Sequence, residues 1–270
     1  MKEQIESLLK DYEYEPNDRY RELAETHLSS HALIDFIRCP ALYKRKRDGL
    51  IPSYDSAAYL VGRAAHTAIL EGDAAFEREY EVGGPVNEKT GKPYGQTTKK
   101  WQEYEASVGK PILTEPQAAL VDRMAEGVKA NKLAREMLEV GRPEVVVRSE
   151  CVTGPRQIRI DWLSPEHGIV DLKTCESLTK FQWNARDFRY HNQAAFYQEG
   201  LAAAIGLYVP FHFIAVEKKE PFRCGVWEVS DNTMILALDE NKRAMAELAD
   251  CMNDRVWPTR YEKKRILEIN

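Results

Sequence analysis

Two aspartates and a lysine lie in a stretch of the chain whose alternating pattern predicts two neighbouring β-strands. Asp161 lies in the first strand, and Asp171 and Lys173 lie in the second. Because residues i and i+2 of a strand point to the same side, Asp171 and Lys173 share one face, and Val170 and Leu172 face the core. A turn between the strands makes them a hairpin, which can bring Asp161 beside Asp171. The sequence therefore predicts two carboxylates and a lysine together at one edge of a sheet.

Such a set of side chains suits a particular chemistry. Carboxylates are hard oxygen ligands that suit Mg²⁺ or Mn²⁺. A bound divalent metal lowers the pKa of a water molecule and stabilises charge on a phosphate, and a lysine beside it can orient or deprotonate that water. The three residues therefore indicate phosphodiester hydrolysis. On these residues alone, the more frequent explanation is an exposed hairpin that carries a surface ion pair.

The elements that must position these residues follow from the hydrophobic pattern. Helices are predicted over residues 2–13, 32–38, 55–71, 190–204 and 231–252, with two or three more within 98–140. Strands are predicted over 144–152, 157–163, 169–174, 211–217 and 224–229, and an exposed loop over 83–97. In the second strand, alternation places Ile158, Ile160 and Trp162 on one face. This order predicts one α/β domain over residues 25–270, with a central mixed β-sheet flanked by helices, and a helical N-terminal extension over residues 1–24.

Composition narrows the class of protein. The chain has 270 residues, of which 43% are hydrophobic, which excludes wholesale disorder. Its net charge of −5 gives no global sign of a nucleic-acid partner, so a DNA-binding surface would have to be local. Five scattered cysteines without a C-x-x-C pair argue against a disulfide framework or a zinc ribbon, and favour a cytoplasmic location. The N-terminus predicts no signal peptide, and the most apolar window, residues 200–216, is too short to span a membrane.

Five further motifs occur in one order along the chain. They are a helix over Leu28–Phe36 followed by Cys39-Pro40, then Gly62-Arg63-Ala64-Ala65-His66, then Arg159-x-Asp161 with Asp171-Leu172-Lys173, then Tyr190-His191-x-Gln193-x-x-x-Tyr197, and finally Trp257-Pro258-Thr259-Arg260-Tyr261. Over roughly residues 25–262 the chain thereby resembles the PD-(D/E)xK nuclease superfamily, and within it the RecE-type phage exonucleases, relatives of lambda exonuclease. The resemblance implies a restriction-endonuclease-like fold and a Mg²⁺-dependent exodeoxyribonuclease, for which Mn²⁺ would substitute. It also implies 5′→3′ digestion of linear double-stranded DNA that leaves a 3′ single strand for recombination by strand annealing.

The resemblance also implies roles for individual residues. His66, Asp161, Asp171 and the Leu172 carbonyl would hold metal, and Lys173 would align the attacking water. A lone histidine in a helix of small residues is otherwise more often a core or capping histidine. Gln193 and Tyr197, four residues apart on one helical face, would support substrate or water, and otherwise form a surface polar pair. Glu144 is either an accessory acidic residue of the site or an ordinary edge-strand glutamate, with Glu150 a weaker rival for the accessory role.

The remaining expectations concern partners. Contacts with DNA are predicted for Arg159, Arg189, Tyr190, Lys44 and Arg45, and less strongly for the segment Lys99-Lys100-Trp101. Relatives form rings around DNA, so a homo-oligomeric ring, a trimer or tetramer, and a single-strand annealing recombinase as partner are implied. No [4Fe–4S] cluster is predicted, because Cys39 has no C-terminal C-x-x-C companion. Two alternatives stay open, namely another DNA nuclease of the same fold, such as an endonuclease or repair nuclease, and a catalytically inert DNA-binding relative.

Overall fold

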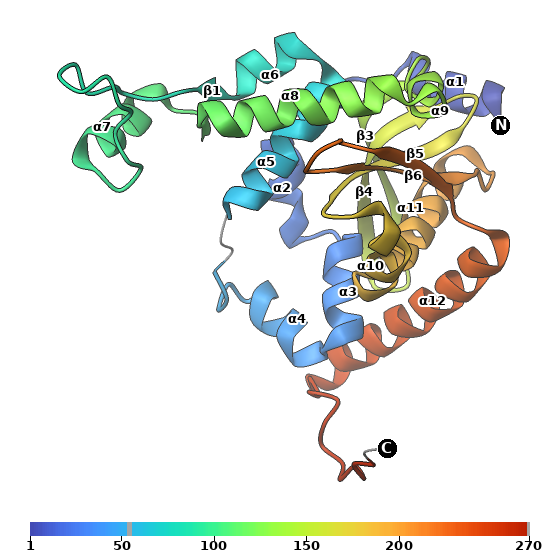
Figure 1. Ribbon diagram of the computed structural model, residues 1–270. Helices are drawn as coiled ribbons and strands as arrows, with labels where there is room; N and C mark the ends of the chain where they lie inside the picture. The colour runs from blue at the N-terminus through green and yellow to red at the C-terminus, as the bar shows by residue number, and fades with distance from the viewer. Residues whose placement is uncertain (53–55, 269–270) are drawn as a thin grey trace.

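A five-stranded sheet forms the centre of the computed structural model, which describes residues 1–52 and 56–268. Its strands lie in chain order: β3 (Arg142–Cys151), β4 (Gly154–Ser164), β5 (Gly168–Cys175), β6 (Phe211–Glu217) and β7 (Cys224–Glu228). All neighbouring pairs are antiparallel except β5 and β6, which are parallel. A parallel pair needs a long crossover, and the helix α11 (Tyr190–Ile205) supplies it. The predicted central mixed sheet flanked by helices is confirmed (Figure 1).

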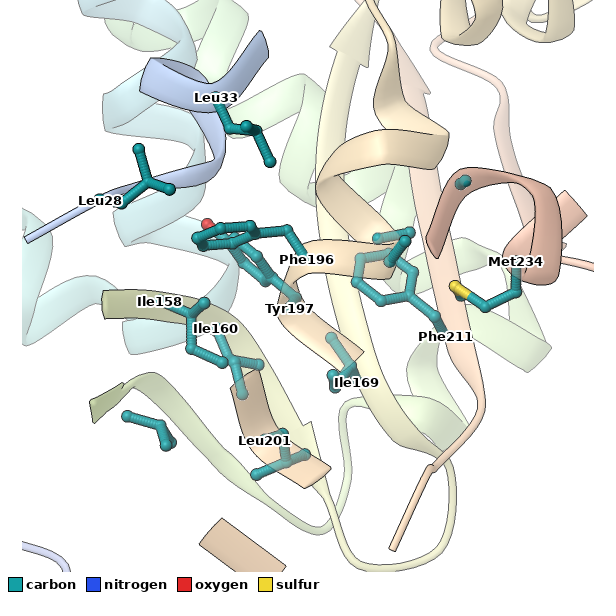
Figure 2. Close-up of a cluster of buried hydrophobic side chains, with 14 of the residues drawn as sticks. Leu28, Leu33, Ile158, Ile160, Ile169, Phe196, Tyr197, Leu201, Phe211 and Met234 are labelled. Atoms are coloured by element: carbon teal, nitrogen blue, oxygen red, sulfur yellow. The ribbon is translucent and has the colours of Figure 1, made fainter. Parts of the chain in front are cut away.

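One face of the sheet packs against α11, α12 (Asp231–Asp254) and α3 (Ser30–Arg38). Figure 2 shows this core, in which Phe196 and Leu201 of α11 meet Ile158, Ile160 and Phe211 of the strands. Phe196 is fully buried. Burial of such a side chain contributes roughly 1.5–3 kcal/mol. This layer fixes α11 against the strands that carry the two aspartates.

The other face is covered by α5 (Ala57–His66), α8 (Glu115–Ala130) and α9 (Lys132–Met137). The small residues Ala64 and Ala65 let α5 pack closely, and both are fully buried beside Val170 and Leu172 of β5. Val170 and Leu172 therefore face the core, as predicted. A capping box at Thr114 begins α8, the long helix at the top of Figure 1.

The predicted common face of Ile158, Ile160 and Trp162 is wrong for Trp162. Ile158 and Ile160 lie in the core beside α11, but Trp162 lies in the core beside α5 and α8. The two-residue alternation changes phase between Ile160 and Trp162, where Glu144 of the neighbouring strand takes a left-handed φ of 57°. That backbone conformation is uncommon for a residue other than glycine, and it breaks the regular pleat of the strand pair.

The N-terminal part packs on the sheet domain. It comprises α1 (Lys2–Lys10), α2 (Asn17–Glu22) and a short 3₁₀ turn, η1 (Leu23–Glu25). Ile5 of α1 is fully buried in the core beside α11. The Tyr12 hydroxyl donates to the Glu144 carbonyl at 3.0 Å and accepts from the Val146 amide at 2.9 Å. The segment after α1 therefore stabilises the irregular backbone of β3.

Proline and glycine residues mark several of the helix ends. The helix predicted over 32–38 ends at Arg38, and Pro40 begins a further helix, α4 (Pro40–Arg47), because proline suits the first turn of a helix. The helix predicted over 55–71 divides into α5 and a π-helical turn, η2 (Thr67–Glu71), and its predicted start at Asp55 lies outside the described residues. It stops at Gly72, whose φ of 85° suits glycine. The described residues form no helix long and apolar enough to cross a membrane.

An arm projects from the domain at the left of Figure 1. It follows α6 (Asp73–Glu79) and contains β1 (Glu81–Val82), α7 (Lys99–Val108) and β2 (Ile112–Leu113), with β1 and β2 in parallel. Trp101 is buried within the arm, at 4% exposure, so it does not offer the ring to DNA that the segment Lys99-Lys100-Trp101 suggested. The sequence pattern also missed α10 (Phe181–Asp187) and the turn η3 (Leu178–Lys180), which lie between β5 and α11.

Candidate active site

A cleft of about 1400 Å³ opens over the strands that carry the acidic residues. One wall is the segment from Tyr14 to Arg21, and the other is the face of α5 formed by residues 59, 62, 63 and 66. These four positions are three or four residues apart, so they lie on one side of the helix. Asp161, Leu172 and Lys173 reach the cleft between the two walls. The hairpin is therefore the floor of a cleft and not an exposed surface.

Asp171 is held beneath this floor by two partners. Its Oδ1 forms an ion pair with Lys173 Nζ, and its Oδ2 accepts a hydrogen bond of 2.9 Å from Gln193 Nε2. The Asp171 side chain is 1% exposed and that of Lys173 is 16% exposed. The shared face of Asp171 and Lys173 is thereby confirmed. Lys173 Nζ also lies 4.8 Å from the centre of the Tyr190 ring, at a distance typical of a cation–π contact.

Asp161 occupies the gap where β4 and β5 separate. The paired positions of these strands end at Trp162 and Val170, and the Asp161 Oδ2 atom then accepts a hydrogen bond of 2.9 Å from the Leu172 amide. His66 Nδ1 approaches the same oxygen at 3.3 Å from the end of α5. The carboxylate is thus oriented by the backbone of β5 and by the imidazole, and the Leu172 carbonyl belongs to the same peptide stretch.

Burial shifts the pKa values of the ionisable groups on the floor of the cleft, and the Lys173 charge only partly offsets its effect on the two aspartates. Burial raises the pKa of Asp171 to about 6, against the opposing influence of Lys173. Burial likewise raises the pKa of Asp161. Burial lowers the pKa of His66, and the Lys173 charge lowers it further, so the imidazole is neutral at pH 7. Burial also disfavours the Lys173 ammonium, but Asp171 and Asp161 together raise the pKa of Lys173 above its ordinary value, so it stays charged.

These residues have the donor chemistry of a divalent-cation site. Two carboxylates, a neutral imidazole and a backbone carbonyl are ligands for a hard divalent ion, and a cation would relieve the cost of ionising Asp161 and Asp171. Within residues 1–52 and 56–268, however, no three His, Cys, Asp or Glu side chains are gathered closely enough to hold a metal ion as they stand. Both Asp171 carboxylate oxygens face Lys173 and Gln193, so Asp171 would have to reorient to share a cation with Asp161.

Glu144 is part of the cleft wall and pairs with Arg159. The Arg159 Nε atom donates to Glu144 Oε2, and its Nη1 donates to Asn17 Oδ1 at 3.1 Å. Its guanidinium also lies 5.7 Å from the centre of the Tyr20 ring. Burial and the nearby Asp161 charge raise the pKa of Glu144. The geometry places Glu144 beside the site and holds Arg159 within the wall, while contact of Arg159 with DNA stays a prediction.

The structure divides the other predicted residues into two groups. Gln193, Tyr197 and Tyr190 line the cleft, and Gln193 and Tyr197 are 5% and 6% exposed, so they are not a surface pair. Arg189, Lys44 and Arg45 do not line the cleft. Arg189 forms an ion pair of 2.8 Å with Glu240 of α12, and Lys44 pairs with Asp48, which directly follows α4. Their contact with DNA, if present, is made outside this cleft.

Sequence reasoning missed several residues of the cleft. His31, at the start of α3, lines it close to the Lys173 charge, which lowers the His31 pKa after the larger effect of burial. Glu71 lies at the end of the π-helical turn, and burial, with the charges of Glu144 and Glu79, raises its pKa to about 7. Tyr14 belongs to a segment expected to lie outside the domain. His31 stands within a motif quoted above, whereas no local pattern marks Glu71 or Tyr14.

Comparison with known families agrees with this geometry. Residues 29–268 match the family described as a PDDEXK-like domain of unknown function (DUF3799). The chain belongs to this family. Among solved structures, it is similar to a "putative exonuclease" from Eubacterium rectale, with 18% identity, a TM-score of 0.69, and coverage of 96% of this chain and 97% of that one. A phage-related exonuclease from Haemophilus somnus matches with 13% identity and a TM-score of 0.39, over 87% of this chain and 99% of that one. No curated protein matches the sequence.

These matches settle the fold and the family. The predicted PD-(D/E)xK resemblance is confirmed, and so is the restriction-endonuclease-like architecture. The match begins at residue 29, after the N-terminal extension, although that extension supplies part of the cleft wall.

Proposed function

We propose that this protein is a divalent-metal-dependent exodeoxyribonuclease. The observation that carries the proposal is the convergence of Asp161, Lys173 and His66 on the floor of one cleft, with Asp171 directly beneath, bound by Lys173 and Gln193. The similar structure from Eubacterium rectale, described as a "putative exonuclease", supports the same reaction class. His66, Asp161, Asp171 and the Leu172 carbonyl would hold Mg²⁺ or Mn²⁺. When bound, the cation supplies positive charge at the scissile phosphate and lowers the pKa of a water molecule.

The residues of the chain then have separate tasks. Lys173 stays protonated, because the two aspartates raise its pKa, so it orients the attacking water or the phosphate as a donor and does not act as a general base. Tyr190 and Asp171 hold the Lys173 ammonium in place. Neutral His66 would have a nitrogen lone pair available for the cation, as metal binding requires. Burial of the floor restricts access of bulk water to the reacting phosphate.

Cleavage of linear duplex DNA tests this function. The protein should degrade linear duplex in Mg²⁺ and not in EDTA, and Asp161→Asn should lose activity because the change removes a charged ligand. Glu150→Gln is a matched control, since Glu150 lies on the neighbouring strand but is exposed and away from the cleft. Full activity of Asp161→Asn, or equal loss in Glu150→Gln, would contradict the assignment. Binding of DNA without cleavage would favour an inert relative.

The finer substrate and assembly also belong to the proposal. Following the resemblance, we propose 5′→3′ digestion that leaves a 3′ single strand, by a homo-oligomeric ring that cooperates with a single-strand annealing protein. A ring must be threaded by a DNA end, so covalently closed circles should be spared. Rapid cutting of closed circles would indicate an endonuclease, and a monomer in light scattering at micromolar concentration would contradict the ring.

A further inference from the structure

Tyrosine is concentrated in the cleft. The protein has 13 tyrosines, and among the described residues six of them line the cleft. Two of the six, Tyr14 and Tyr59, are 47% and 57% exposed, so a large part of each side chain faces solvent. They lie on opposite walls, Tyr14 on the N-terminal segment and Tyr59 on α5. The catalytic geometry described above uses neither of them.

Tyr59 is held in a fixed relation to the reactive floor. It precedes His66 by seven residues on the same side of α5, which at 1.5 Å per residue is about 10 Å along the helix. The guanidinium of Arg63, one turn further on, lies 5.3 Å from the centre of the Tyr59 ring. Stacked nucleotides of one strand are about 3.4 Å apart, so a strand whose phosphate reaches His66 would place a base about three nucleotides away near Tyr59.

Tyr14 is held from both sides by its neighbours in the chain. Tyr12 is bonded to the backbone of β3 at Glu144, and the Glu15 carboxylate forms two hydrogen bonds, of 2.6 and 2.8 Å, with the Arg148 guanidinium. The residues around Tyr14 are therefore fixed to the sheet while its own ring is exposed in the cleft. An aromatic ring on a fixed backbone loses little conformational entropy when a flat ligand stacks on it.

The remaining features of the cleft indicate what that flat ligand is. The lining has five carboxylates and five arginine or lysine side chains, so its side-chain charge does not by itself attract phosphates. Its volume of about 1400 Å³ exceeds the 300–1,000 Å³ of most small-molecule pockets. The reactive groups are also largely buried, with the Asp161 side chain 16% exposed, so the substrate must enter between the walls. A narrow strand with exposed bases meets these conditions better than a rigid duplex.

We propose that Tyr14 and Tyr59 are stacking platforms for unpaired bases of a DNA strand that enters the cleft. This inference rests on the proposed nuclease function. It adds that the DNA in the cleft is a single-stranded end of several nucleotides. Every base has a π-face, so the preference for sequence is weak.

Binding of a phosphorothioate oligonucleotide tests the proposal, because its linkages resist cleavage in Mg²⁺. A strand carrying 2-aminopurine reports stacking through its fluorescence, and titration gives its affinity. Tyr14→Ala and Tyr59→Ala should each weaken single-strand binding roughly 5- to 150-fold, whereas Tyr14→Phe and Tyr59→Phe, which keep the ring, should stay within about threefold of the parent. A blunt duplex of equal length should lose less affinity than the single strand.

Tyr208→Ala is the matched control, since Tyr208 is similarly exposed at 54% but does not line the cleft. Parent-like affinity of both alanine variants would overturn the proposal, as would an equal loss in Tyr208→Ala or in the phenylalanine variants. Equal losses for duplex and single strand would overturn the preference for unpaired bases. The parent protein is tested separately with bis(4-nitrophenyl) phosphate in Mg²⁺: absence of hydrolysis there and on DNA removes the nuclease function itself, whereas hydrolysis with unaffected stacking variants removes only this inference.

Discussion

Replacing Asp171 by asparagine should stabilise the metal-free protein at neutral pH. Asparagine resembles the protonated aspartic acid in shape and is neutral at every pH. In the folded protein, burial raises the pKa of Asp171 from 3.8 to about 6, so ionisation of this carboxyl is harder in the folded state than in the unfolded state. A shift of about 2 units corresponds to about 3 kcal/mol, because each unit is 1.36 kcal/mol.

The sign of the pH dependence follows from linkage. Below pH 3.8 the carboxyl is protonated in both states, and the stability it contributes is fully present. Between pH 3.8 and about 6 the carboxyl ionises in the unfolded state but stays largely protonated in the folded state, so the free energy of unfolding falls as the pH rises. Above about pH 6 this stability is lost. The variant does not pay this cost, so its advantage in the free energy of unfolding should grow from about 1–2 kcal/mol at pH 5 to about 3 kcal/mol at pH 8. The last figure is a rise in Tm of roughly 5 °C for a chain of this length.

Urea unfolding of both proteins in EDTA, at pH 5 to 8, measures this difference. Glu150→Gln serves as control, because an exposed carboxylate should change the free energy of unfolding by less than about 0.5 kcal/mol. Added Mg²⁺ should stabilise the parent more than Asp171→Asn, since binding to the folded state alone raises stability. A variant that is less stable than the parent at pH 8, or a difference that does not vary with pH, would refute the reasoning.

Three further substitutions test the supports of the site. Lys173→Arg keeps the charge but places a larger planar group in a buried space, so single-turnover cleavage in saturating Mg²⁺ should fall roughly 10²–10³-fold, as on loss of a positioned donor. A rate within about threefold of the parent would reject the positioning role. Asn241→Leu removes two buried hydrogen bonds of 2.9 Å with Asn192 at the start of α11, and urea unfolding should show a loss of about 2–4 kcal/mol; an unchanged midpoint would mean that this pair does not anchor α11. Gly127→Ala would place a Cβ 2.3 Å from the Phe222 carbonyl oxygen, so the Tm of the variant should fall. Alanine is the better helix former, so a rise in Tm would mean that the backbone moves apart without cost and would contradict this prediction.

Much of the floor of the site could be predicted because it depends on local periodicity. The spacing of Asp171 and Lys173 fixes their common face in any strand, and the helical spacing of Gln193 and Tyr197 fixes theirs. The burial of Val170 and Leu172 follows from the same alternation. What periodicity cannot supply is the partner of each side chain, and the Gln193–Asp171 hydrogen bond joins residues 22 positions apart.

The walls could not be predicted, because they depend on contacts between distant segments. Tyr12 bonds the backbone at Glu144, 132 residues away, and this contact accompanies the left-handed φ that changes the phase of β4 before Trp162. A pattern of alternating residues assumes a regular pleat, so it placed Trp162 on the wrong face. The same segment brings Tyr14 into the cleft, although composition marks residues 1–24 only as a helical extension.

Arg159 shows that residue type alone does not reveal how strongly a candidate DNA contact is already held by the protein. An arginine beside an aspartate of the candidate site suggests a phosphate ligand, yet Glu144 and Asn17 already bond its guanidinium, and Tyr20 lies against it. Breaking a partly buried ion pair to reach a phosphate would leave Glu144 without its partner beside Asp161, at a cost that one phosphate contact does not repay. Positive charge for the substrate can instead come from Lys173, from the other arginines that line the cleft, and from the cation that the carboxylates would attract. Stacking on the exposed tyrosines then supplies binding that does not depend on charge, which suits a cleft whose acidic and basic side chains balance.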